Sequence, residues 1–136
     1  MKLKAFYLFF LLFFTSCSSY EQYRNNLEYY EDPNLFHESM QRLTDIIVYD
    51  IFSPPVASRI YVYPSIAAYE VLVNDNPTFI SFSGQINGLK DIPKPDHDKE
   101  YSFTLASLHA FIKVGKDLIF SEDKINDFQE DLFLNL

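Results

Sequence analysis

The sequence predicts an all-α fold of about four helices, and three observations carry this prediction. Apolar residues recur at spacings of three and four in three separate stretches, which is the pattern of a helix with one face on a core. A fourth stretch, residues 56–73, is apolar almost all round. With only three glycines, and with 14 Phe and 10 Tyr, the chain is of the kind that buries a core and is not disordered.

The first residues have the pattern of a secretory signal. A basic start (Lys2 and Lys4) is followed by a run of ten apolar residues, 5–14, and then by Thr15-Ser16-Cys17. A helix needs about 20 apolar residues to cross a bilayer, so this run is too short to span one. Residues 1–16 are therefore predicted to be a signal peptide and are excluded from the fold.

Cys17 is the only cysteine of the chain, so it has no partner for an internal disulfide. It follows two small residues after the apolar run, which is where lipidation requires a cysteine, although Phe14 is a looser match than leucine before the cut. We predict cleavage before Cys17 and anchoring to a membrane by lipid, including palmitate, on that cysteine. Two alternatives stay open: an ordinary signal peptide in which Cys17 is a bystander, and an uncleaved anchor. Ser18 gives no inner-membrane retention signal, which favours the outer membrane of a Gram-negative cell envelope.

Cleavage leaves residues 17–136, enough for one domain. Residues 17–33 are polar and tyrosine-rich and are predicted to be a tether, and residues 34–136 are predicted to be the helical region. The net charge of −8 becomes more negative when Lys2 and Lys4 are removed. Because the chain has no basic cluster, nucleic acid is excluded as a partner.

The first predicted helix begins after the tether, with Asn34 as its N-cap. Its apolar stripe, with spacings of four, three, four and four, consists of Phe36, Met40, Leu43, Ile47 and Ile51. Ser53-Pro54-Pro55 ends this helix, because the residue before a proline is pushed out of the α region.

The same tripeptide starts the second helix, with Ser53 as its N-cap and proline in the first turn. A helix that is apolar on every side, as residues 56–73 are, is typical of a buried core or of a membrane span. Arg59, Pro64 and Glu70 argue against a span, so we predict that these residues form the central helix of the domain.

Ser53→Ala should weaken this helix by about 1 kcal/mol through loss of the cap, and an unchanged melting curve would count against the cap.

Arg59 and Glu70 are the only charges on the second helix. They lie on nearly the same face but about 16 Å apart along the axis, so they cannot pair with each other. If both are buried, each needs a partner on another element. We expect structural ion pairs, and the alternative is that the two residues line a functional site.

Residues 75–101 contain three prolines and two glycines and are predicted to be a long loop. Loops of this length are usually functional, form a lid, or pack against something larger. Asp96-His97-Asp98 and Glu100 could be ligands for a metal, but no second ligand set at a fixed spacing accompanies them. We interpret the group as a solvated acidic loop and predict no metal.

Residues 103–120 are predicted to form a third helix, with His109 beside its apolar stripe. No Ser, Cys or second His stands at a recognisable spacing, so His109 is interpreted as a packing residue.

Ser121 is expected to cap a fourth helix. Four of the five residues 132–136 are apolar, which gives the expectation of an element interrupted in progress, and so of an incomplete part of a larger helical bundle. The stripe of the fourth helix is Ile125, Phe128 and Leu132.

Residues 50–61 (DIFSPPVASRIY), followed by Ala67-Ala68-Tyr69-Glu70, resemble the N-terminal helical region of the vanadium-dependent haloperoxidases. These proteins belong to the superfamily of type 2 phosphatidic acid phosphatases. Members open a helix with Ser-Pro-Pro-x-Ala-x-Arg and carry Ala-x-Tyr-Asp/Glu shortly afterwards. Residues 103–110 (FTLASLHA) resemble a second helix of the group. The resemblance spans most of residues 40–125, and its motifs are packing motifs.

The resemblance implies that the chemistry of the family lies in segments that this chain lacks. Those segments are Lys-x6-Arg-Pro, Pro-Ser-Gly-His and Ser-Arg-x5-His-x3-Asp, whose cations hold vanadate or phosphate and whose last histidine coordinates vanadium or attacks phosphorus. Here no arginine precedes a proline, Pro64-Ser65 runs into Ile66, and Ser58-Arg59 has Ser65 where the histidine should stand. An acidic chain with three arginines is also poorly suited to hold a trianion. We expect no catalytic residue and no cofactor in this chain, and a vanadate or phosphate site only in the missing segment.

The sequence therefore predicts a lipid-anchored part of a haloperoxidase- or phosphatase-like protein that is not catalytic alone and packs against a catalytic helical bundle. It leaves the choice between haloperoxidase and phosphatase open. Two alternatives remain. The chain could be one half of a split enzyme, or a small non-enzymatic surface lipoprotein that binds a partner through residues 75–101.

Overall fold

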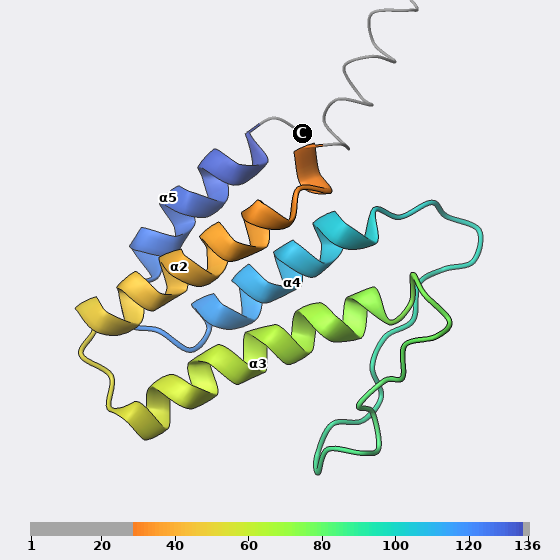
Figure 1. Ribbon diagram of the computed structural model, residues 1–136, viewed down its shortest axis with the longest axis horizontal. Coiled ribbons are helices and arrows are strands. Elements are labelled where there is room, and N and C mark those ends of the chain that lie inside the picture. Colours follow the sequence, from red (N-terminus) through yellow and green to blue (C-terminus); the bar gives the residue numbers. More distant parts are fainter. Residues whose placement is uncertain (1–28, 135–136) are drawn as a thin grey trace, which may run out of the picture.

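The computed structural model describes residues 29–134, which form an all-α bundle (Figure 1). This part of the chain has four helices, α2 (Pro33–Tyr49), α3 (Pro54–Leu72), α4 (Phe103–Lys116) and α5 (Glu122–Phe133), as the sequence predicts. Cys17 and the predicted signal peptide lie outside the described residues. None of the helices described combines the length and the apolar character needed to cross a membrane.

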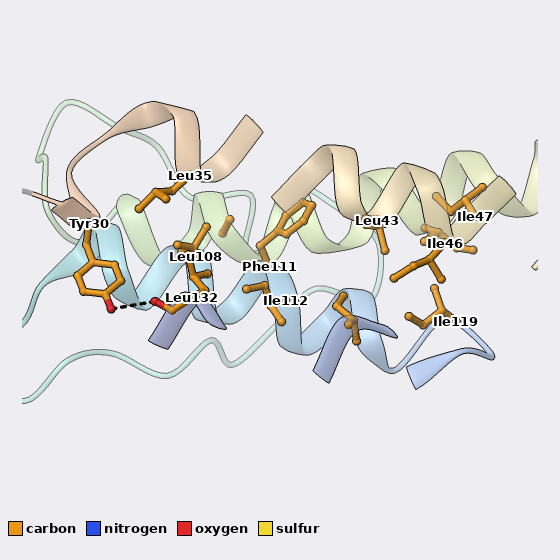
Figure 2. Close-up of a cluster of buried hydrophobic side chains, with 13 residues drawn as sticks. Tyr30, Leu35, Leu43, Ile46, Ile47, Leu108, Phe111, Ile112, Ile119 and Leu132 are labelled. Atoms are coloured by element: carbon orange, nitrogen blue, oxygen red, sulfur yellow. Dashed lines mark hydrogen bonds between the residues drawn. The ribbon is translucent and has the colours of Figure 1, made fainter. Parts of the chain in front are cut away.

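Residues 29–33, which fall in the predicted tether, belong to the bundle. Tyr30 is fully buried, and its hydroxyl donates a hydrogen bond of 3.0 Å to the carbonyl of Leu132 near the other end of the chain (Figure 2). Burial, and secondarily the neighbouring Tyr29, raises the pKa of Tyr30. The first residues that the structure describes are thus fixed against α5.

The first helix begins at Pro33, one residue before the predicted cap. Asp32, not Asn34, is the N-cap, and its side chain accepts a hydrogen bond of 2.9 Å from the backbone N–H of Asn34. Proline at the first helical position has a preset φ and no N–H to satisfy, which favours a start at Pro33. The helix ends at Tyr49, so Ile51 does not continue the apolar stripe. Ile51 has a φ of 57° and is 88% exposed.

α2 and α4 are the central helices, and the prediction that residues 56–73 would be central is wrong for the described chain. α2 and α4 each contact the other three helices, and the α4 side chains Phe111 and Ile112 are fully buried. α3 lies at the edge of the bundle and packs mainly on α4 (Figure 1). Only four of its residues are buried, namely Ile60, Pro64, Ala68 and Glu70.

Three helices approach one another closely at Gly115 of α4. A Cβ atom built on Gly115 would lie 3.4 Å from Leu43 Cδ1 of α2 and 3.7 Å from Pro64 Cγ of α3, which is ordinary contact distance. The core runs along the length of the bundle and contains apolar side chains from all four helices (Figure 2). Close packing of this kind is how a domain of this size excludes water.

Two serines stand at the predicted cap positions, but neither side chain makes a capping bond. Ser53 is the N-cap residue of α3 and Ser121 that of α5. Because Ser53 makes no capping bond, Ser53→Ala should change the free energy of unfolding by less than about 0.5 kcal/mol, and not by the roughly 1 kcal/mol that the sequence predicts.

The third helix also differs from its prediction, since it ends at Lys116 and not at residue 120.

The hydroxyl of Ser121 is instead directed to Asp50, which joins two turns of the bundle. Asp50 Oδ1 accepts from the Ser121 hydroxyl at 2.5 Å, and Oδ2 accepts from the backbone N–H groups of Phe120 and Ser121 at 2.9 and 3.1 Å. Burial alone would raise the pKa of Asp50, but these bonds and the nearby Lys124 ammonium outweigh it and lower the pKa. The α2–α3 turn is thereby fixed to the α4–α5 turn.

Asp50→Asn tests this link. The amide nitrogen would face donors, so the free energy of unfolding should fall by about 2 kcal/mol at neutral pH. A lowered carboxyl pKa stabilises the fold above the unfolded pKa, and this contribution is lost as the pH falls through the folded pKa. Below about pH 4, the difference between wild type and variant in urea unfolding should therefore shrink. Asp45→Asn, an exposed site on α2, should change stability by less than about 0.5 kcal/mol.

Candidate functional site

The loop between α3 and α4 leaves the bundle and doubles back beside α3 (Figure 1). The buried carboxylate of Glu70 on α3 holds it in place. Glu70 Oε2 accepts from the Ser81 hydroxyl and Oε1 from the backbone N–H of Phe82, both at 2.6 Å. Glu70 is only 6% exposed, so these two donors satisfy a carboxylate that would otherwise be costly to bury.

The expected ion pair of Glu70 is therefore wrong: its partners are a hydroxyl and an N–H group. Sequence reasoning could place Glu70 on the helix and require a partner, but it could not identify one eleven residues away in a loop. A charge-assisted hydrogen bond to a neutral donor meets the same requirement as an ion pair.

Further contacts fix the same loop. The hydroxyl of Tyr69 donates to the carbonyl of Ile80 at 3.1 Å, and its ring lies 4.8 Å from that of Phe82. A tight turn follows, in which the N–H of Gly84 donates to the carbonyl of Leu89 at 3.0 Å. Gly88 has a φ of +88° within this turn, a conformation that favours glycine.

These contacts enclose a pocket of about 820 Å³ between α3, the loop and α4. Its size lies within the range of small-molecule sites, and most of its lining is apolar. Aromatic residues in the lining are Tyr63, Tyr101 and Phe103. Aliphatic residues include Ile66, Val71, Ile86, Leu89, Ile92 and Val114.

The pocket has few groups that could do chemistry. Glu70 borders it, but both of its carboxylate oxygens already accept hydrogen bonds from the loop. Lys94 is the one cation in the lining, which contains neither arginine nor histidine. A trianion such as vanadate or phosphate needs several converging cations or N–H donors, and this lining does not provide them.

Arg59 does not join Glu70 in a shared site. It is exposed on α3, does not border the pocket, and makes no ion pair with any residue between 29 and 134. Its expected structural ion pair is therefore not formed within the described chain. The idea that Arg59 and Glu70 line one site is likewise not supported, because Glu70 lies in the pocket wall and Arg59 on an open helix surface.

The acidic residues of the loop are exposed and do not converge. Asp96 pairs with Lys99 at 3.4 Å and accepts from the N–H of Asp98. Among residues 29–134, no group of three His, Cys, Asp or Glu side chains is placed to hold a metal ion. His109 is exposed on α4, with its ring 5.8 Å from that of Phe133 on α5.

The described residues form an all-α bundle whose pocket does not provide the cations that an oxyanion site needs. Comparison with solved structures shows what this bundle is similar to. The described helices resemble part of the crystal structure of a bacterial vanadium-dependent iodoperoxidase, with a TM-score of 0.73 and 44% sequence identity. The match covers 75% of this chain. It supports a relationship between this chain and the vanadium haloperoxidases.

The chain spans only 25% of the iodoperoxidase chain. No protein-family model matches the sequence, and no curated protein matches it either. The predicted resemblance to the vanadium haloperoxidases is thus confirmed by one structural relative at high sequence identity, over a part of that relative.

Glu70→Ala should release the loop without unfolding the helices. Ser81 and Phe82 lose their acceptor, so cleavage within residues 80–95 by a non-specific protease should become about tenfold faster. The helical signal in circular dichroism should change little, since the loop has no helix of its own. Glu38→Ala, an exposed change on α2, serves as the control and should leave the cleavage rate unaltered. Equal cleavage of both variants would show that Glu70 does not hold the loop.

Proposed function

We propose that this chain is the lipid-anchored, non-catalytic helical part of a vanadium haloperoxidase-like protein. The observation that carries the proposal is the 44% identity to an iodoperoxidase of which the chain spans one quarter. In this proposal the helices pack against a catalytic bundle that holds vanadate or phosphate. The bundle belongs to the same protein or to a second polypeptide.

The lack of catalytic groups in the sequence supports a non-catalytic role. Holding an oxyanion requires cations arranged around it, and the pocket offers Lys94 alone. The three arginines do not occur in the segments by which the family binds its cofactor, as set out above. Two histidines lie on the described helices, His37 on α2 and His109 on α4, and both are exposed; the ring of His109 lies beside that of Phe133.

An alternative function is that of a small surface lipoprotein that binds a partner through residues 75–101. The observation that favours this alternative is that residues 86–95 of that loop supply one wall of the pocket. A free-standing binding module should be monodisperse by itself, whereas a part that lacks its bundle should aggregate. Sedimentation of the chain at increasing concentrations distinguishes the two.

The chain by itself should be inactive. Purified protein incubated with vanadate, hydrogen peroxide and iodide or bromide should oxidise neither halide above the rate of vanadate alone. It should also fail to hydrolyse a phosphomonoester. Halide oxidation or phosphate release that co-purifies with the chain, and that is lost on heating, would contradict the proposal.

The proposed anchor is tested at Cys17. In a Gram-negative host the mature protein should begin at Cys17, and mass spectrometry should find acyl chains on its first residue. Each buried methylene contributes about 0.8 kcal/mol, so several acyl chains should hold the protein in the membrane fraction. Cys17→Ala should abolish both acylation and membrane retention. A wild-type protein cut elsewhere and free of lipid would exclude the anchor.

A further inference from the structure

One side of α3 is apolar and uncovered by any residue between 29 and 134. Viewed down the helix, α4 covers the side of Ile60, Pro64 and Ala68. At 100° per residue the opposite side carries a different set, which we call the open face of α3. It consists of Arg59, Val62 and Ile66, with Tyr63 at one edge and Ser58 and Ser65 at the other.

The open face differs from the outer faces of the other helices. α5 presents Glu122, Asp123 and Asp127 to solvent, and α2 presents Glu38 and Asp45. On α3 the equivalent positions include large apolar side chains, with Val62 49% and Tyr63 48% exposed, beside the exposed Ser58 and Arg59. A contiguous apolar surface of this kind marks an interaction site.

The sequence of α3 gives the same indication independently. A helix that is apolar all round is typical of the interior of a larger protein. The described chain buries only one side of it, so the other side is suited to burial by further protein.

The open face continues into the pocket. Tyr63 and Ile66 belong to both, and the pocket extends the apolar surface toward the loop held by Glu70. Arg59 is the one charge on the open face and has no ion-pair partner among the described residues. Arginine is enriched at protein interfaces, where its guanidinium reaches acceptors on the partner.

A second exposed apolar group lies at the end of the bundle, where the two turns meet. Its members are more exposed than those of α3, with Ile51 at 88% and Phe120 at 78%, although Lys124 lies 4.2 Å from the ring of Tyr49 and Phe120 packs 4.8 Å from Phe52. The pocket beside α3 does not extend to this group. It provides matched control positions, such as Val48 of α2, which is 71% exposed.

We infer that the open face of α3 and the adjoining pocket are the surface on which the remaining helices of a vanadium haloperoxidase-like protein pack, with apolar side chains of a partner helix entering the pocket. This inference rests on the proposed function. The structural relative indicates what covers the open face, because three quarters of that iodoperoxidase lie outside the part that this chain spans. In the assembled protein α3 becomes an interior helix, as its sequence pattern indicates.

Cysteine labelling tests the inference. Val62→Cys and, as the control, Val48→Cys are made in a Cys17→Ser background, so that each protein has a single thiol. Each variant is labelled with a maleimide in two forms. One form is the full chain alone. The other is a chimera in which these helices replace the matching quarter of the bacterial iodoperoxidase.

In the full chain both thiols should react fast. In the chimera Val62→Cys should react more slowly by about 100-fold or more, since labelling then requires local opening, while Val48→Cys should change by less than about threefold. Iodide oxidation by the chimera without added cysteines reports on the proposed function separately.

An active chimera in which Val62→Cys still reacts fast would overturn the inference and leave the proposed function standing. A chimera that neither folds nor oxidises iodide would contradict the proposed function, and the inference with it. Slow labelling of Val62→Cys in the full chain alone, at a concentration where sedimentation finds the chain monomeric, would also overturn the inference, because another segment of this chain would then cover the face.

Discussion

The packing of α2 and α4 against each other and against the two outer helices is the constraint on which the rest of this structure depends. Phe111 and Ile112 of α4 are buried, and Leu43 of α2 and Pro64 of α3 both pack beside Gly115. Because α2 and α4 occupy the centre, α3 is left at the edge with one side covered. The apolar open face and the pocket beside it both follow from that placement.

Two carboxylates secure the parts that packing alone does not. Asp50 joins the turns at one end of the bundle, and Glu70 ties the long loop to α3. Both carboxylates accept hydrogen bonds from hydroxyl and N–H donors, and the Lys124 ammonium also lowers the pKa of Asp50. These two buried or half-buried charges therefore serve the fold.

Much of the fold could be predicted from the sequence, because helical periodicity is a local property. All four described helices were predicted, and so was the relationship to vanadium haloperoxidases. Start positions were less accurate, since Pro33 fixes the start of α2 more strongly than the capping preference of Asn34. The partners of Glu70 and Asp50 could not be predicted, because each lies on a segment brought near only by the fold. The central place assigned to α3 was wrong for a related reason. The apolar pattern of α3 indicates that all its sides are suited to burial. It does not show which other helices lie beside it in the described chain.

Native-state hydrogen exchange on the full chain tests the central claim, that α4 and not α3 is central in this bundle. The account predicts the slowest amide exchange around Phe111 and Ile112, and exchange at least about tenfold faster in residues 56–63 of α3, whose outer side is open. Equal protection of the two helices would contradict it, because α3 would then be covered on both sides in the chain alone.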